Sequence, residues 1–263
     1  MYHNSINRKI LYYTIISFYK FTVTYIYDTR MSIIVNKINK NYGKQRALKN
    51  ISFKINKGDI VGLLGPNGAG KSTLIKILTS YIKEDSGNIK ICNIDKQGNE
   101  LVIKSKIGYL PESNPLYTNM YVKEYLSFTG KIYNIKNLEF KISEIIKKTG
   151  LKKEQHKKIY QLSKGYKQRV GIAATLIHNP NVLILDEPTT GLDPNQLLEV
   201  RNLIKNLSID KTVLLSSHII QEIEKICNRI IIIRRGEIVE NQLIETLKKK
   251  NINLEEHFRK LTS

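Results

Sequence analysis

Cysteine and long apolar runs are scarce in this sequence of 263 residues. Cys92 and Cys227 stand alone, with neither a C-x-x-C pair nor clustered histidines beside them. Isolated cysteines of this kind argue against a metal cluster and suggest a reducing compartment. Residues 31–263 contain no apolar segment of the roughly 20 residues that a transmembrane helix needs, so this part of the sequence is not expected to cross a membrane.

Acidic residues are also few, with 23 Asp and Glu against 43 Lys and Arg, so the formal net charge is +20 at pH 7. Such an excess raises nucleic acid or an anionic membrane surface as partners. The basic residues are mostly lysines, however, spread along the chain beside many Ile and Asn. No basic stripe interleaved with aromatics is present, so we interpret them as solvated lysines and expect no specific nucleic-acid partner.

Residues 1–30 differ from the rest of the sequence. Residues 10–27 carry a single charge, Lys20, and are rich in Tyr, Thr, Ile and Phe, which places them at the lower edge of membrane-spanning length. No small-residue cleavage site follows, which argues against a secretory signal. A membrane anchor is one interpretation; the one we favour is that translation starts at Met31, directly before the first predicted strand. The intact mass of the native protein distinguishes the two.

A glycine-rich motif organises the chain. It reads Gly65-Pro66-Asn67-Gly68-Ala69-Gly70-Lys71-Ser72-Thr73 and fits the phosphate-binding pattern G-x-x-x-x-G-K-[ST] at every fixed position. The glycines let successive amide N–H groups point at a polyphosphate. Lys71 would then reach the β- and γ-phosphates and Ser72 would bind magnesium, while a helix beginning at Thr73 adds a favourable dipole. The motif occurs once and predicts binding of a nucleoside triphosphate.

The flanking segments supply the strand, loop and helix that this motif requires. Residues 59–64 are typical of a buried strand, and apolar residues then recur at helical spacing, at Leu74, Ile77, Leu78, Tyr81 and Ile82.

Further strands are predicted around this unit. Residues 33–55 follow the β pattern, and Ile89 and Ile91 suggest another strand after a turn at Ser86 and Gly87. Tyr42 lies just before the second strand; an exposed tyrosine is usually only surface, but in this place it could stack on an adenine ring.

Residues 119–151 are helical in period, with two apolar faces. The first comprises Val122, Tyr125, Leu126, Thr129 and Tyr133, and the second Leu138, Ile142, Ile145 and Ile146. Such stripes are more typical of a core than of a binding face. Because the segment lies between residues 111–115 and 162–166, we predict an inserted helical subdomain.

Two carboxylates follow a continuous apolar run at residues 182–185. Such a run is typical of a central parallel strand, and α/β sheets place ligands at the carboxyl ends of these strands. Asp186 would hold magnesium, directly or through water, and Glu187 would orient and deprotonate the attacking water. The alternative is a solvated Asp-Glu turn, and the phosphate loop upstream favours the functional interpretation.

The remaining chain continues this α/β alternation. Asp193 is a plausible helix N-cap with Pro194 in the first helical position. Residues 212–218 indicate a strand that ends in His218, which could sense the γ-phosphate, although a lone histidine is more often structural. Residues 229–240 predict a hairpin, and the tail beyond residue 242 is expected to be helical, with Leu254, His257, Phe258 and Leu261 as its apolar edge.

With these motifs in this order, the chain resembles the nucleotide-binding subunit of ATP-binding cassette (ABC) transporters over residues 31 to about 245. The resemblance implies an α/β fold, with a P-loop NTPase core, an antiparallel β subdomain and an inserted helical subdomain. It also implies roles by position: Tyr42 stacks on adenine, Gly65 to Thr73 hold the phosphates, Asp186 and Glu187 are the magnesium carboxylate and general base, and His218 is the switch histidine. Ser163 and Gly165 would cap the γ-phosphate of ATP held by an opposite subunit, with Asp193 as an inter-subunit aspartate.

Two positions depart from the family pattern. The loop that links the catalytic core to the membrane partner usually has glutamine, whereas this chain has Glu112, which can approach magnesium but cannot donate a hydrogen bond as an amide does. The signature reads Leu162-Ser163-Lys164-Gly165-Tyr166 instead of Leu-Ser-Gly-Gly-Gln. Both departures look like the exporter branch with type-2 permeases, and residues 109–117 are similar in particular to the gliding-motility ATPase subunit.

We therefore predict an ATPase subunit that binds ATP and Mg²⁺, dimerises with an identical or paired cassette, and drives a separately encoded permease at the cytoplasmic face of the cell membrane. The expected organisation is an N-terminal extension (1–30), a cassette domain (31–245) with a helical subdomain at about 113–165, and a helical tail (246–263).

Two other functions share parts of this pattern. A soluble cassette ATPase in cofactor assembly or nucleic-acid transactions is favoured by the net charge alone; Glu112, Lys164, the single cassette and the lack of a coiled-coil insertion oppose it. A regulator that binds ATP without turnover is opposed by the presence of Asp186, Glu187 and His218.

Overall fold

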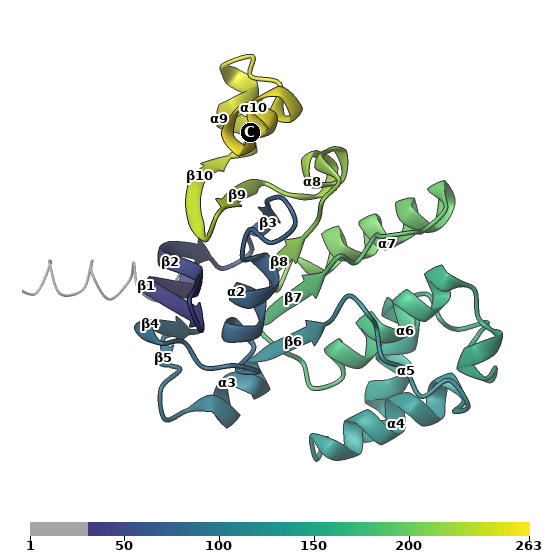
Figure 1. Ribbon diagram of the computed structural model, residues 1–263. Helices are drawn as coiled ribbons and strands as arrows, with labels where there is room; N and C mark the ends of the chain where they lie inside the picture. Colours follow the sequence, from purple (N-terminus) through teal and green to yellow (C-terminus); the bar gives the residue numbers. More distant parts are fainter. Residues whose placement is uncertain (1–30) are drawn as a thin grey trace, which may run out of the picture.

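The computed structural model describes residues 31–263, which form two β-sheets and the helices packed on them (Figure 1). The predictions for residues 1–30 lie outside the described residues. The smaller sheet is antiparallel with strand order β2-β1-β4-β5, formed by β1 (Met31–Tyr42), β2 (Gln45–Asn56), β4 (Ser86–Ile91) and β5 (Ile94–Asp95). The larger sheet has the order β10-β9-β3-β8-β7-β6, formed by β3 (Ile60–Leu64), β6 (Ile107–Leu110), β7 (Val182–Asp186), β8 (Thr212–Ser216), β9 (Arg229–Arg234) and β10 (Glu237–Leu243).

The centre of the larger sheet is parallel. Strand β3 pairs with β8 and β9, and β7 pairs with β6 and β8, all in parallel register. Every residue of β3, β7 and β8 is buried, as expected for strands covered on both faces. Because these strands run the same way, Leu64, Asp186 and Ser216 end at the same edge of the sheet.

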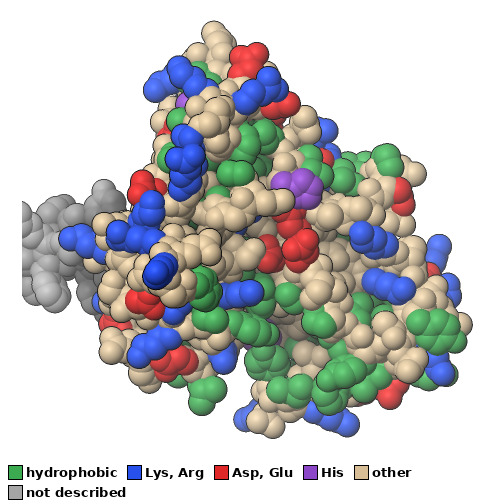
Figure 2. Space-filling model, in the orientation of Figure 1, with side chains coloured by type: hydrophobic (Ala, Val, Ile, Leu, Met, Phe, Trp, Pro, Cys, Tyr) green, Lys and Arg blue, Asp and Glu red, His purple; other side chains and the backbone are tan. Residues whose placement is uncertain are grey.

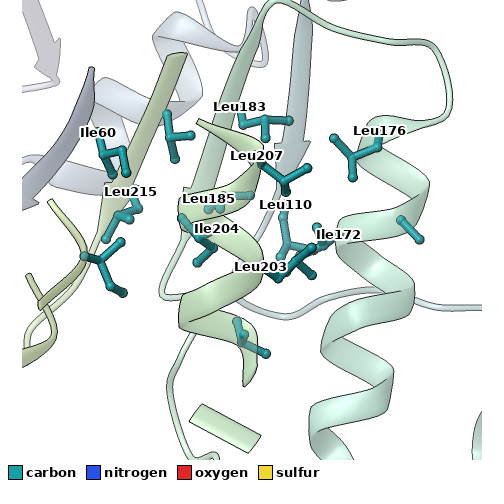
Figure 3. Packing of buried hydrophobic residues seen from close by; sticks show 14 of the residues in the cluster. Ile60, Leu110, Ile172, Leu176, Leu183, Leu185, Leu203, Ile204, Leu207 and Leu215 are labelled. Carbon is teal, nitrogen blue, oxygen red and sulfur yellow. The ribbon is translucent and has the colours of Figure 1, made fainter. Parts of the chain in front are cut away.

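The helices make two hydrophobic cores, one on each face of this sheet. On one face, Leu183 and Leu185 of β7 pack with α6 (Lys164–Leu176), α7 (Pro194–Leu207) and α8 (Ile220–Ile226), and Figure 3 shows apolar side chains of β7, α6 and α7 converging. On the other face, Val182 and Ile184 join the core that α2 (Lys71–Leu78), α3 (Glu100–Lys106) and the antiparallel sheet complete. This alternation along β7 follows from the two-residue period of a strand.

The helical region contains α4 (Val122–Ile132), α5 (Leu138–Lys148) and a 3-10 turn η1 (Ile159–Gln161). These lie beside β6 and away from the antiparallel sheet (Figure 1). Helix α6 begins at Lys164 and packs against both α4 and α5. The predicted apolar faces are confirmed at Val122, Leu126, Ile142, Ile145 and Ile146, which are all buried. Tyr133 of the first face is instead 39% exposed. The limits of the subdomain at about 113–165 stay a prediction, as do the other domain limits.

The structure corrects the bounds of the predicted helix after the phosphate loop. Helix α2 begins at Lys71, two residues before Thr73, because Gly70 takes the left-handed backbone that lets the chain turn directly into the helix. It ends at Leu78, so Tyr81 and Ile82 lie beyond it, and Tyr81 is 70% exposed. The left-handed backbone of Ser80 (φ 57°) ends the helix, although the helical spacing of apolar residues continues to Ile82.

Two smaller predictions also differ from the structure. Ser86 and Gly87 belong to β4 and not to a turn before it, because Ser86 pairs with Asn39 of β1. Strand β8 ends at Ser216, so His218 lies two residues past the strand, where its side chain is free of the strand pairing and contacts Glu187.

The hairpin of β9 and β10 is confirmed, and so is the helical tail, with α9 (Ile244–Lys249) and α10 (Leu254–Thr262).

His178 joins the larger sheet to the helical region. Its Nε2–H donates to the Ile107 carbonyl at 3.0 Å, and its ring stacks on Tyr133 at 4.0 Å between centroids. The buried Nδ1 has no hydrogen-bond partner among the described residues. Burial lowers the pKa of His178 below its ordinary value of 6.5, and the positive charge of Lys211 acts in the same direction.

We expect His178→Gln to reduce the acid sensitivity of folding. A depressed pKa means that the unfolded chain takes up the proton first, so stability is present above pH 6.5 and is lost as pH falls below it. Between pH 7.5 and pH 5.5 the Tm of the wild-type chain should fall more than that of the variant, by at most the roughly 2–4 °C that one proton, about 1.4 kcal/mol per pH unit, produces at this size. His156→Gln, at an exposed histidine, is the control. Equal slopes for wild type and His178→Gln would contradict the expectation.

Candidate functional site

The loop between β3 and α2 has the backbone geometry of an anion cradle. Gly68 (φ 76°) and Gly70 (φ 112°) take left-handed conformations, and a Cβ on Gly70 would lie 2.8 Å from the Ala47 carbonyl oxygen. A larger residue would therefore force the loop away from β2. No side chain caps the N-terminus of α2, so its first N–H groups have no intrahelical acceptor and face the loop. This arrangement favours a bound phosphate group.

Lys71 is anchored inside this loop. Its Nζ donates to the carbonyl oxygens of Gly65 at 2.6 Å and Pro66 at 3.2 Å. Burial lowers the pKa of Lys71, and the negative charges of Glu187, Asp186 and Glu112 oppose that shift. The structure thus brings one predicted phosphate ligand into the electrostatic field of three predicted carboxylates. Ser72 and Thr73 lie in the first turn of α2 beside it.

Asp186 ends β7 in a largely buried position, 8% exposed. The Ser216 hydroxyl donates to Asp186 Oδ1 at 2.5 Å and accepts from the Glu187 N–H at 3.0 Å. Burial raises the pKa of Asp186. The hydrogen bond from Ser216 lowers this pKa, whereas the negative charge of Glu187 raises it further. Ser216 therefore ties the two carboxylate residues to the neighbouring strand.

Magnesium can be tested against these donors. A buried carboxylate beside a second carboxylate is stabilised by a cation, and Mg²⁺ prefers one or two carboxylates together with water and phosphate oxygens. Asp186 and the Ser72 hydroxyl are hard oxygen donors of this kind. Among residues 31–263, no group of three or more His, Cys, Asp or Glu side chains is arranged so that it could hold a metal ion by itself. The residues present fit magnesium held jointly with a phosphate.

Glu187 is held on both sides. Its Oε2 accepts a hydrogen bond from Thr190 Oγ1 at 2.9 Å and lies 2.9 Å from His218 Nδ1. Its backbone is left-handed, with φ 51°, which is uncommon for a residue with a side chain and is often found at functional sites. The Glu187 carboxylate is 11% exposed while the His218 ring is 56% exposed, so the pair lies at the surface edge of the sheet. Figure 2 shows acidic side chains gathered next to a histidine near the middle of the visible face.

The other predicted residues lie in two further places. Tyr42 ends β1 with its ring 48% exposed and pairs with Gln45 at the turn into β2, the strand that contacts Gly70. Glu112 is exposed on the segment after β6. Ser163 caps α6 and Asp193 caps α7. No hydrogen bond among the described residues joins Ser163, Gly165 or Asp193 to Lys71, Asp186 or Glu187.

Sequence reasoning missed three residues of these groups: Thr190, Gln196 and Ser216. Ser216 ends the predicted strand beside that of Asp186, so a polar residue at the carboxyl end of a neighbouring strand was the available signal. Gln196 contacts Ser163 and Gly165 from α7. The sequence offers no sign of that contact, because it joins residues about 30 positions apart.

Comparison with known proteins identifies relatives of this chain. The family described as ABC transporter matches residues 48–190. The bacitracin transport ATP-binding protein BcrA of Bacillus licheniformis is 39% identical over 225 residues, 84% of this chain and 73% of BcrA. The lantibiotic transport ATP-binding protein SrtF of Streptococcus pyogenes is 37% identical over 206 residues, 78% of this chain and 88% of SrtF.

A solved structure supports the predicted fold and activity. A dimeric ATP-binding cassette in a post-hydrolysis state with ADP and Pi superposes with a TM-score of 0.71 at 29% identity, covering 81% of this chain and 98% of that one. The predicted P-loop NTPase fold is therefore confirmed, and so is the assignment as an ATP-hydrolysing enzyme. Gliding motility stays a prediction. Among residues 31–263 no helix is long and apolar enough to cross a membrane. The chain belongs to the ABC transporter family, as an ATP-binding subunit.

Proposed function

We propose that this chain dimerises on ATP and powers an exporter whose permease is a separate protein in the cell membrane. The observation that carries the proposal is the placement of Glu187 between Thr190 and His218, beside Lys71 and Asp186. A phosphate-binding lysine, a buried carboxylate for a cation and a positioned base are what ATP hydrolysis needs together. The names of BcrA and SrtF support a transport role for this chain as well.

Each residue then has a part in the reaction. Lys71 and the N–H groups of the loop bind the β- and γ-phosphates, and Tyr42 stacks on the adenine. Asp186, Ser72 and Glu112 would hold Mg²⁺, which would neutralise charge on the phosphates when bound. Glu187 orients the attacking water and takes its proton. His218 donates from Nδ1 to Glu187 and keeps that carboxylate aimed at the water.

In this proposal, the second half of each nucleotide-binding site comes from another chain. Ser163 and Gly165 form the N-terminus of α6, and Asp193 that of α7. Such helix starts favour an anion. Two chains facing each other would place Ser163 of one at the γ-phosphate on the other, so the nucleotide is enclosed only in the dimer. Either identical chains or two different cassettes satisfy this geometry.

An aromatic groove is the surface we assign to the permease. Its volume is about 210 Å³, and four tyrosines line it, Tyr81, Tyr109, Tyr125 and Tyr133. It lies on the segment after β6 that leads to Glu112, and exposed aromatic side chains continue from it at Tyr117 and Phe128. Exposed apolar patches mark protein interaction sites. Through this contact the permease would locate the chain at the cytoplasmic face of the membrane.

Purification of the tagged protein from gently solubilised membranes tests the function. We expect mass spectrometry to find a polytopic membrane protein with the wild-type chain, and at least tenfold less of it with Tyr81→Glu, because a charge in the groove must be desolvated on docking. Phe140→Glu is the matched control, since Phe140 is an exposed aromatic on α5 outside the groove. Recovery of only a soluble complex or nucleic acid would overturn the transport role and favour the soluble cassette ATPase.

A further inference from the structure

One amide side chain joins the starts of two helices in this chain. Gln196 Oε1 accepts a hydrogen bond from the Gly165 N–H at 3.0 Å, and Gln196 Nε2 donates to Ser163 Oγ at 3.3 Å. Gln196 is itself fixed, because Asp193 caps α7 and its Oδ1 accepts the Gln196 N–H at 2.9 Å. Ser163, Gly165 and Asp193 are therefore connected through Gln196.

The space around Gly165 fits this side chain closely. A Cβ on Gly165 would lie 2.7 Å from Cγ, Cδ and Oε1 of Gln196, which is well inside van der Waals contact. Gly165 has an ordinary helical backbone, so a glycine is needed at this position because a side chain would not fit, and not because the chain makes a left-handed turn. The Lys164 side chain also lies against Gly191, in the segment before Asp193. The N-termini of α6 and α7 are thus packed as one unit.

The hydrogen bonds also determine where the Ser163 hydroxyl points. A serine oxygen has two acceptor lone pairs and one O–H donor. The Ser163 oxygen accepts from Gln196 Nε2 and from the Tyr166 N–H at 3.4 Å. With both lone pairs facing N–H groups, the hydroxyl hydrogen must point away from them. Among residues 31–263 this hydrogen has no acceptor, so it is available to an anion outside the chain.

We propose that Gln196 is a positioning residue that turns the Ser163 hydroxyl into a donor for the phosphate held by a second chain, and that Gly165 is glycine so that Gln196 can reach it. The proposal rests on the proposed function, in which Ser163 meets the opposite ATP. The proposed role requires the amide of Gln196, and a carboxylic acid at the same position would not fulfil it. A carboxylate at position 196 would accept the Ser163 hydrogen and turn the hydroxyl inward, away from the phosphate.

The first experiment is a double-mutant cycle on the nucleotide-free chain. Alanine is favoured over glycine in a helix, so Gly165→Ala should stabilise α6 unless Gln196 is in the way. We expect Gly165→Ala to lower the Tm by roughly 2–6 °C in the wild-type background, through overpacking, and to leave it unchanged or raise it in the Gln196→Ala background. The same shift in both backgrounds would overturn the packing of Gln196 on Gly165.

The second experiment follows ATPase activity as a function of protein concentration, whose midpoint reports dimerisation. Gln196→Ala and Gln196→Glu should each raise this midpoint about tenfold, the loss expected for one well-made hydrogen bond to a charged group. Binding of a fluorescent ATP analogue to the single chain should be unchanged, because Gln196 contacts no residue of the phosphate loop. Asn195→Ala is the control, since Asn195 lies on the same turn of α7 and is exposed. A partly unfolded variant would lower the number of binding sites, so the midpoint is expressed as the concentration of chains that bind the ATP analogue.

The outcomes separate the two levels of the proposal. Midpoints equal to that of the wild type for Gln196→Ala and Gln196→Glu would overturn the positioning role. A wild-type chain that neither dimerises on ATP nor hydrolyses it would overturn the proposed function, and the positioning role with it. The unfolding cycle contains no nucleotide, so in that case it would still show whether Gln196 and Gly165 are coupled.

Discussion

Replacing Glu187 by glutamine is expected to lower ATP turnover by on the order of 10²-fold or more while ATP binding stays intact, a typical loss for a general base. Glutamine keeps the size of the side chain and an oxygen that can accept from Thr190 Oγ1 and His218 Nδ1, the two contacts at 2.9 Å that hold Glu187. The geometry of the site is therefore retained. What is lost is the ability to take a proton from water.

Steady-state phosphate release and equilibrium binding of an ATP analogue measure the two parts of this expectation separately. Glu256→Gln, at an exposed position on α10, controls for the charge change. Because hydrolysis is blocked after binding, the Glu187→Gln chain should also accumulate as an ATP-bound dimer. Near-normal turnover would reject Glu187 as the base, and His218 would then be the next residue to examine.

Replacing Lys71 by alanine should abolish measurable ATP binding, with a loss of affinity of roughly 10²-fold or more, since charge-assisted contacts to phosphate are among the strongest in proteins. Two carbonyl oxygens, of Gly65 and Pro66, hold the Lys71 ammonium group in the loop. Burial lowers the pKa of Lys71, while Glu187, Asp186 and Glu112 favour its charged form. Alanine would leave these carboxylates facing the incoming phosphates without a compensating charge.

Lys76→Ala is the matched control for this variant. Lys76 lies on the same helix, α2, but it is exposed and makes no contact with the loop carbonyls. Isothermal titration with ATP should show wild-type affinity for Lys76→Ala and no saturation for Lys71→Ala. Retained affinity in the Lys71→Ala chain would count against the phosphate-loop assignment.

The two experiments separate binding from chemistry. Failure of Lys71→Ala alone to bind places the nucleotide at the loop between β3 and α2. Loss of turnover in Glu187→Gln alone assigns the chemical step to the end of β7. If both variants lost binding, Glu187 would be needed for the nucleotide or for folding, and thermal unfolding of the nucleotide-free chains would distinguish these.

Local sequence pattern was sufficient for the elements that carry the site. Three signals depend only on residues close by in the sequence: the continuous apolar runs of β3 and β7, the glycines of the phosphate loop, and the Asp193-Pro194 start of α7. Period and turn chemistry report such local preferences directly. Where two local signals competed, periodicity alone was wrong: apolar spacing extended α2 to Ile82, but the backbone of Ser80 ends it at Leu78.

Tertiary structure alone decided which of these elements meet. The strand order β10-β9-β3-β8-β7-β6 puts Ser216 beside Asp186 and His218 beside Glu187, and the packing of α6 on α7 puts Gln196 on Gly165. Each contact joins residues about 30 positions apart, and a hydrophobic period reports which face of an element is buried but not which neighbour covers it. The sequence by itself thus determined the phosphate loop, the strand-end carboxylates and the class of enzyme. The partners that orient those groups followed only from how the strands and helices pack.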